Sequence, residues 1–134
     1  MLHFRTRREA EEAAIPRAIR EVILASIDTF ETALAKLESQ WNPDDDGWFS
    51  LLEPAEADLP LKAMGWERRL GDLVVEAVHF HPRARLWECI HIPGNNWCWT
   101  CFLPDSPALP REVRAWLLAH ATEADAALAR RARP

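Results

Sequence analysis

The feature that most constrains the fold is a change in hydrophobic period along the chain. Between residues 16 and 40 apolar side chains recur every three or four positions, which is the spacing of one helix face. Between residues 71 and 103 the spacing becomes strand-like, with β-branched and aromatic residues in short runs. A long helical stripe followed by several strands predicts an α+β domain.

The long helix is expected over residues 16–40. Its apolar stripe consists of Ile19, Ile23, Ile27, Phe30, Leu34 and Leu37, and Trp41 continues the spacing. Pro16 suits the first helical turn, where its missing N–H costs nothing, and the Asn42-Pro43 step ends the helix. We expect residues 1–14 to form a flexible or short helical arm before it.

Three strands are expected within residues 71–103, and they form an antiparallel meander. They are Leu73–His81, Leu86–Ile92 and Trp97–Leu103, separated by segments rich in turn-forming residues. Residues 48–52 are a candidate fourth strand. Helical spacing returns after the prolines at positions 104, 107 and 110, so a C-terminal helix over residues 110–130 is expected to pack on the sheet.

Length and charge set limits on domain number and partners. A chain of 134 residues predicts a single domain over residues 1–134. The net charge of −5 argues against binding to nucleic acid, and no apolar run approaches the roughly 20 residues that cross a membrane. Three cysteines are too few and odd in number for a disulfide scaffold. We expect a cytoplasmic protein that binds neither nucleic acid nor a membrane.

The meander concentrates residues that could perform chemistry, and their positions depend on strand register. If Pro93–Asn96 closes the second hairpin, His91 lies opposite Cys98, Cys89 lies opposite Thr100, and Cys101 points to the other face. If residues 82–85 close the first hairpin, Glu76 lies opposite His91. Glu76, His91 and Cys98 would then form one row across three strands.

Such a row has two chemical interpretations and one structural one. A carboxylate, an imidazole and a thiol in line match a cysteine nucleophile with its base, so Cys98, His91 and Glu76 are catalytic candidates. Cys89 beside His91 and Cys98 would instead supply ligands to zinc. Buried free cysteines, however, commonly behave as small apolar residues. We favour packing, and therefore expect binding rather than catalysis, with no metal and no cofactor.

The sheet is expected to be apolar on both faces, and the sequence contains seven tryptophans and no tyrosine. Two helices can cover one face, and the other needs its own cover or a partner. We expect Trp87, Phe102, Phe80 and Trp48 to contact another protein or a second copy of this chain, because aromatic residues anchor interfaces. The sequence thus predicts a small acidic protein-binding module, such as a regulator, inhibitor or assembly factor.

Overall fold

The computed structural model describes residues 1–37, 47–57, 68–70, 73–94 and 97–132. The elements, in chain order, are β1 (Leu2–Phe4), α1 (Arg7–Glu12), α2 (Arg17–Leu37), β2 (Gly47–Leu51), the 3₁₀ turn η2 (Pro54–Glu56), β3 (Arg68–Leu70), β4 (Leu73–His81), β5 (Leu86–Gly94), β6 (Trp97–Pro104), α5 (Arg111–His120) and α6 (Glu123–Ala132). The predicted α+β class is confirmed.

The sheet is larger and less regular in direction than the predicted meander. Six strands pair in the order β1-β2-β6-β5-β4-β3. The meander β4-β5-β6 is antiparallel, whereas β2 lies parallel to β6, so the sheet is mixed. The prediction of a purely antiparallel sheet of three or four strands is wrong in this respect, because β2 arrives from the N-terminal half and joins the far edge of the meander.

The N-terminal segment, which we expected to be a flexible or short helical arm, contains both a strand and a helix. β1 is only three residues long and pairs antiparallel with β2, so it lacks the length that makes alternation visible in a sequence. Thr6 then caps α1, because its hydroxyl accepts a hydrogen bond from the backbone N–H of Glu9 at 3.2 Å. α2 begins at Arg17, and residues 38–40 of the predicted helix lie outside the described residues.

The expected C-terminal helix is divided into two. α5 ends where Ala121 adopts an extended conformation, with φ −72° and ψ 161°. Thr122 then starts α6 by accepting a hydrogen bond from the N–H of Asp125 at 3.2 Å. Glu123 and Asp125 place negative charge in the first turn of α6, where the helix dipole favours it. The apolar spacing continues across this break, which is why the sequence alone suggested one helix.

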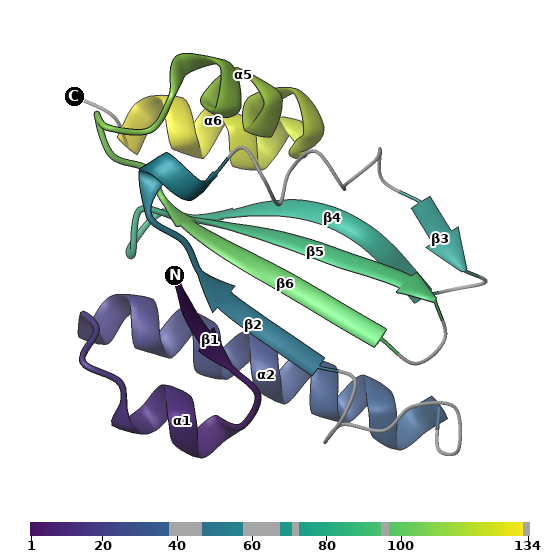
Figure 1. The fold of residues 1–134 in the computed structure, drawn as a ribbon. Coiled ribbons are helices and arrows are strands. Elements are labelled where there is room, and N and C mark those ends of the chain that lie inside the picture. The colour runs from purple at the N-terminus through teal and green to yellow at the C-terminus, as the bar shows by residue number, and fades with distance from the viewer. Residues whose placement is uncertain (38–46, 58–67, 71–72, 95–96, 133–134) are drawn as a thin grey trace.

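Helices cover both faces of the sheet, giving three layers (Figure 1). α1 and α2 lie against one face, over a core of Phe4, Ala10, Ile23, Ile27, Phe30, Phe49, Leu86 and Phe102. α5 and α6 lie on the other face, over a second core that includes Leu52, Val78, Phe80, Trp87, Cys89, Cys101, Leu103, Leu109, Val113, Leu117 and Ala129. The expectation that one face stays open for a partner is therefore corrected, because the N-terminal helices close it.

Within the described residues, no helix has both the length and the apolar character needed to cross a membrane.

Candidate functional site

The predicted row of Glu76, His91 and Cys98 depends on two hairpins, of which one has the expected register. Glu76 pairs with His91 across β4 and β5, and the turn over residues 82–85 closes as expected, with Arg85 at a positive φ of 50°. In the second hairpin, however, Trp99 is the residue opposite His91, and Gly94 pairs with Trp97. The expected loop over residues 93–96 is wrong, because the register shifts between His91 and Gly94.

The shifted register changes which residues share a row. Cys98 is displaced by one position from the residue that pairs with His91. A one-residue displacement exchanges the two faces of a regular strand, so the backbone does not align the three members of the predicted triad. The side chains of Glu76, His91 and Cys98 lie outside the described part of the molecule, and their chemistry stays a prediction.

The same shift brings together two cysteines that the sequence placed on opposite faces. Cys89 pairs with Cys101 rather than with Thr100, and both cysteines are buried in the core under α5 and α6. Burial raises the pKa of the Cys89 thiol well above its ordinary value, and the neighbouring Cys101 and Glu88 raise it further. Because the thiolate is the reactive form, Cys89 is a packing residue and a poor nucleophile at neutral pH.

No group of three or more histidine, cysteine, aspartate or glutamate side chains suited to a metal ion occurs among the described residues. Of the predicted zinc ligands, Cys89 is directed into the α5/α6 core. The side chains of the other two, His91 and Cys98, are not among those described.

The aromatic residues predicted to form an interface are mostly inside the molecule. Trp87 and Phe102 have no exposed surface, and Phe80 is 4% exposed. Trp87 packs on Phe80 with ring centroids 4.8 Å apart, and its Nε1 is buried without a hydrogen-bond partner. The main chain of Trp48 pairs with Trp99 at the β2–β6 contact, and its side chain is outside the described set. Trp87, Phe80 and Phe102 therefore form no surface patch, since α2 covers Phe102 while α5 and α6 cover Trp87 and Phe80.

A buried polar cluster joins α2 to the sheet. The carboxylate of Glu88 on β5 lies 2.6 Å from the hydroxyl of Ser26 on α2 and 2.7 Å from Nε2 of His81 on β4. The Ser26 hydroxyl donates to the Glu88 carboxylate. The acid lies between the hydroxyl and the imidazole, and a serine nucleophile requires the imidazole in the middle. The cluster is thus a structural connection between α2 and the sheet. Its sequence signal was Glu88, a charged residue inside an otherwise apolar strand.

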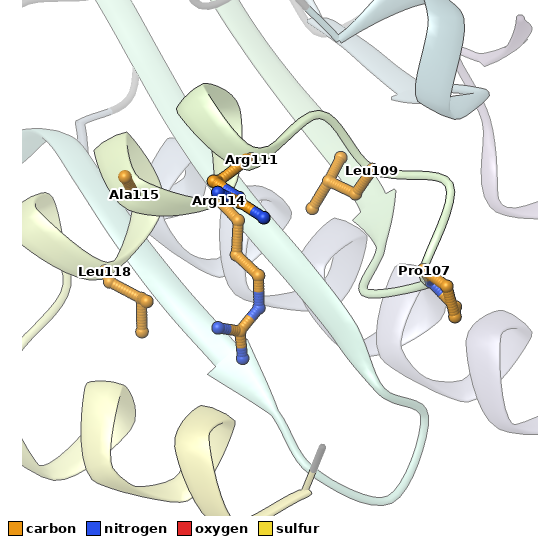
Figure 2. A pocket seen from close by; sticks show the side chains of 6 residues that line it. All are labelled: Pro107, Leu109, Arg111, Arg114, Ala115 and Leu118. Atoms are coloured by element: carbon orange, nitrogen blue, oxygen red, sulfur yellow. The ribbon is translucent and has the colours of Figure 1, made fainter. Parts of the chain in front are cut away.

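A concave site formed by described residues is a groove beside α5, about 470 Å³ in volume. We call it the α5 groove, and Figure 2 shows its lining side chains: Pro107, Leu109, Arg111, Arg114, Ala115 and Leu118. The last four follow the spacing i, i+3, i+4, i+7, which places them on one side of α5. Pro107 and Leu109 come from the loop before the helix. The N–H of Leu109 donates to Ser106 O at 3.0 Å, which closes a turn within the loop, and the buried Leu109 side chain packs in the same core as Val113 and Leu117 of α5.

The two arginines of the α5 groove differ in their partners. Nε of Arg114 donates to Asp105 Oδ1 at 3.0 Å, and its Nη2 donates to Asp105 Oδ2 at 3.5 Å and to Ala129 O at 3.1 Å. The pair is largely buried, with side-chain exposure of 13% for Arg114 and 3% for Asp105. Arg111 is exposed and has no ion pair or hydrogen bond to the part of the chain that is described.

Sequence reasoning missed the α5 groove. The segment from Pro104 to Pro110 was interpreted as a connector, and its contact with α5 follows from tertiary packing. The available signal was a pair of arginines three residues apart at the start of a helix.

Comparisons of the chain with protein-family models, with curated proteins and with solved structures give no match. The functional argument therefore depends on the surface of this molecule itself.

Proposed function

We propose that this chain is a small protein-binding module, acting as a regulator, inhibitor or assembly factor, and that its partner docks in the α5 groove. The observation behind this proposal is that both sheet faces are closed while the groove stays open beside α5. The proposal keeps the class of function that the sequence suggested and moves the docking site from the sheet to a helix.

The composition of the α5 groove suits recognition of another chain. Its walls include apolar side chains of Pro107, Ala115 and Leu118, and Arg111 adds a cation that has no ion pair with any described residue. Arginine beside apolar surface is enriched at the centres of protein interfaces. The volume of about 470 Å³ falls within the roughly 300–1,000 Å³ typical of binding pockets.

Binding is favoured over catalysis by the chemistry of the same lining. Asp105 is held by Arg114 in a largely buried ion pair. The residues lining the groove include no cysteine, serine or histidine that could act as a nucleophile.

The test is site-specific photocrosslinking in cells of the source organism. A benzophenone amino acid replaces Ala115, which is exposed in the α5 groove, and in a matched control it replaces Ala25, which is exposed on α2 in the opposite layer. We expect a discrete crosslinked product at Ala115 and none at Ala25, and mass spectrometry would show whether the partner is another protein or a second copy. Equal labelling at the two positions, or no product at Ala115, would reject docking in the groove.

A further inference from the structure

Building on the proposed docking site, we propose that the α5 groove takes an extended acidic segment of the partner, with an aspartate or glutamate carboxylate bound by Arg111 and apolar neighbours against the groove walls. The step beyond the proposed function is the chemistry of the ligand. It is argued from the charges, the fixed geometry and the length of the groove.

The first argument is charge. The whole chain has a net charge of −5, and yet two guanidinium groups line one groove. Arg114 is neutralised by Asp105 at 3.0 Å, whereas Arg111 has no counterion among the described residues. One positive charge is therefore left without an internal partner, and it is complementary to a single carboxylate.

The second argument is that one half of the anion site is already fixed. The bonds of Arg114 to Asp105 and to Ala129 O use its Nε and Nη2, so the guanidinium plane is held while Nη1 takes part in none of them. Arg111 lies three residues earlier on the same side of α5. A carboxylate bound by Arg111 thus meets a guanidinium that needs little further ordering, which lowers the entropic cost of binding.

The third argument is length, and it favours a peptide over a small anion. Arg111 and Leu118 are seven residues apart, so they are separated by roughly 10 Å along the helix axis at about 1.5 Å per residue. An extended chain covers that distance with about three residues at roughly 3.3 Å each. Ala115 and Leu118 can therefore contact apolar side chains beside the bound acid.

Glu112 limits the charge of the ligand. It is exposed in the first turn of α5, directly after Arg111, and it would repel additional negative charges at this end of the groove. A ligand with one carboxylate fits this arrangement, whereas a polyphosphate or nucleic acid does not.

The experiment is an NMR titration of the ¹⁵N-labelled full chain with two matched pentapeptides. One is acetyl-Ala-Leu-Glu-Leu-Ala-amide, and the other has glutamine in place of glutamate. We expect the glutamate peptide to shift the backbone amides of residues 107–118 and the Nε–H of Arg111, and to bind roughly fivefold more tightly than the glutamine peptide, as one charge-assisted hydrogen-bonded contact predicts. Acetate alone should produce much smaller shifts, because it has no apolar part.

Two exposed substitutions of neighbouring residues provide the control. Arg111→Gln should abolish the preference for the glutamate peptide, whereas Glu112→Gln should keep or increase it, and unchanged amide spectra elsewhere would show that both variants fold. Three results would each overturn the proposal of an acidic ligand. They are equal binding of the two peptides, an unchanged preference for the glutamate peptide in Arg111→Gln, and chemical-shift changes that occur only outside residues 107–118. If Ala115 crosslinks a partner while these titrations show no charge preference, docking stands and only the ligand class is rejected.

Discussion

The two faces of the sheet are closed in different ways. On one face the 21-residue helix α2 lies over the core together with the short helix α1, and Ser26 connects α2 to the sheet through the buried carboxylate of Glu88. On the other face two helices of 10 residues each, α5 and α6, lie over an apolar core that includes two thiols.

The two helical layers also differ in their polar contacts. α5 and α6 are short, and Arg114 connects α5 to Asp105 of the loop and to the last part of α6 rather than to the sheet. α2 is thus joined to the sheet through the Ser26–Glu88 contact. α5 and α6 are joined to each other and to the loop by Arg114, and α6 also meets the sheet, where Asp125 Oδ2 lies 3.6 Å from His79 Nδ1 of β4. The α5 groove lies between α5 and the loop that precedes it.

The largest expected effect comes from the α5/α6 core. Trp87→Ala removes the largest fully buried side chain and should lower the free energy of unfolding by about 3–5 kcal/mol, because a cavity replaces it. Trp116→Ala, at a partly exposed tryptophan of the same layer, should cost less than half as much. Urea unfolding followed by circular dichroism measures both. Equal effects of the two substitutions would contradict the burial of Trp87.

Breaking the ion pair beside the α5 groove ranks second. Asp105→Asn leaves the Arg114 guanidinium largely buried without its counterion and should cost about 3 kcal/mol. The matched control is Glu21→Gln, which breaks the exposed ion pair with Arg17 and should cost about 0.5 kcal/mol or less. Chemical denaturation compares the two. If Asp105→Asn lowered the free energy of unfolding no more than the control does, the ion pair would not fix Arg114. The groove would then have no preorganised guanidinium beside Arg111.

The thiols of the α5/α6 face predict a dependence on pH. The pKa of Cys89 is raised in the folded state, so above about pH 8.5 the unfolded chain releases a proton that the folded chain keeps. Stability should therefore be unaffected by this group below that pH and should fall as pH rises, by up to about 1.4 kcal/mol per pH unit. Unfolding between pH 7 and 10 measures the slope. The slope should be smaller in Cys89→Ala, and an unchanged slope would assign the effect to other groups.

The smallest effect is expected on the α2 face. Ser26→Ala removes one of two hydrogen bonds to the buried Glu88 carboxylate and should cost about 1–2 kcal/mol. Thr29→Ala, which removes a hydroxyl bonded within the exposed side of the same helix, provides the control and should change stability little. Hydrogen exchange of the α2 amides would report the local effect. Equal protection in the two variants would show that Glu88 does not fix α2.

The sequence predicted elements whose signals are local. The stripe from Ile19 to Leu37 and the three strands of the meander each repeat with a period that depends only on neighbouring residues. The first hairpin was predicted in register because four residues separate His81 from Leu86 and leave little choice of pairing. The register of the second hairpin was not predicted. There β5 continues through Pro93, which has no N–H to donate, and the pairing with β6 shifts between His91 and Gly94.

The features that sequence reasoning missed are all tertiary. The strand near residues 48–52 was predicted, and it forms as β2. Its parallel pairing with β6 was not predicted, because it joins residues about 50 positions apart, and nothing near Leu2–Phe4 indicates a strand. The same is true of the α5 groove, where Pro107 meets the side of α5 only after the loop folds back. The buried Cys89–Cys101 pair was missed by a single residue of register.

The parallel pairing of β2 with β6 has a consequence for how the chain folds during synthesis. β6 is the last strand to leave the ribosome, and β1 reaches the sheet only through β2. The apolar stripe of α2 therefore has no complete sheet to pack against until the chain has been synthesised as far as Pro104, the last residue of β6. The meander can assemble from local contacts first, whereas closing the α1/α2 layer requires a long chain loop and is slower. We expect nascent chains that end before β6 to be the form most exposed to aggregation and to chaperones.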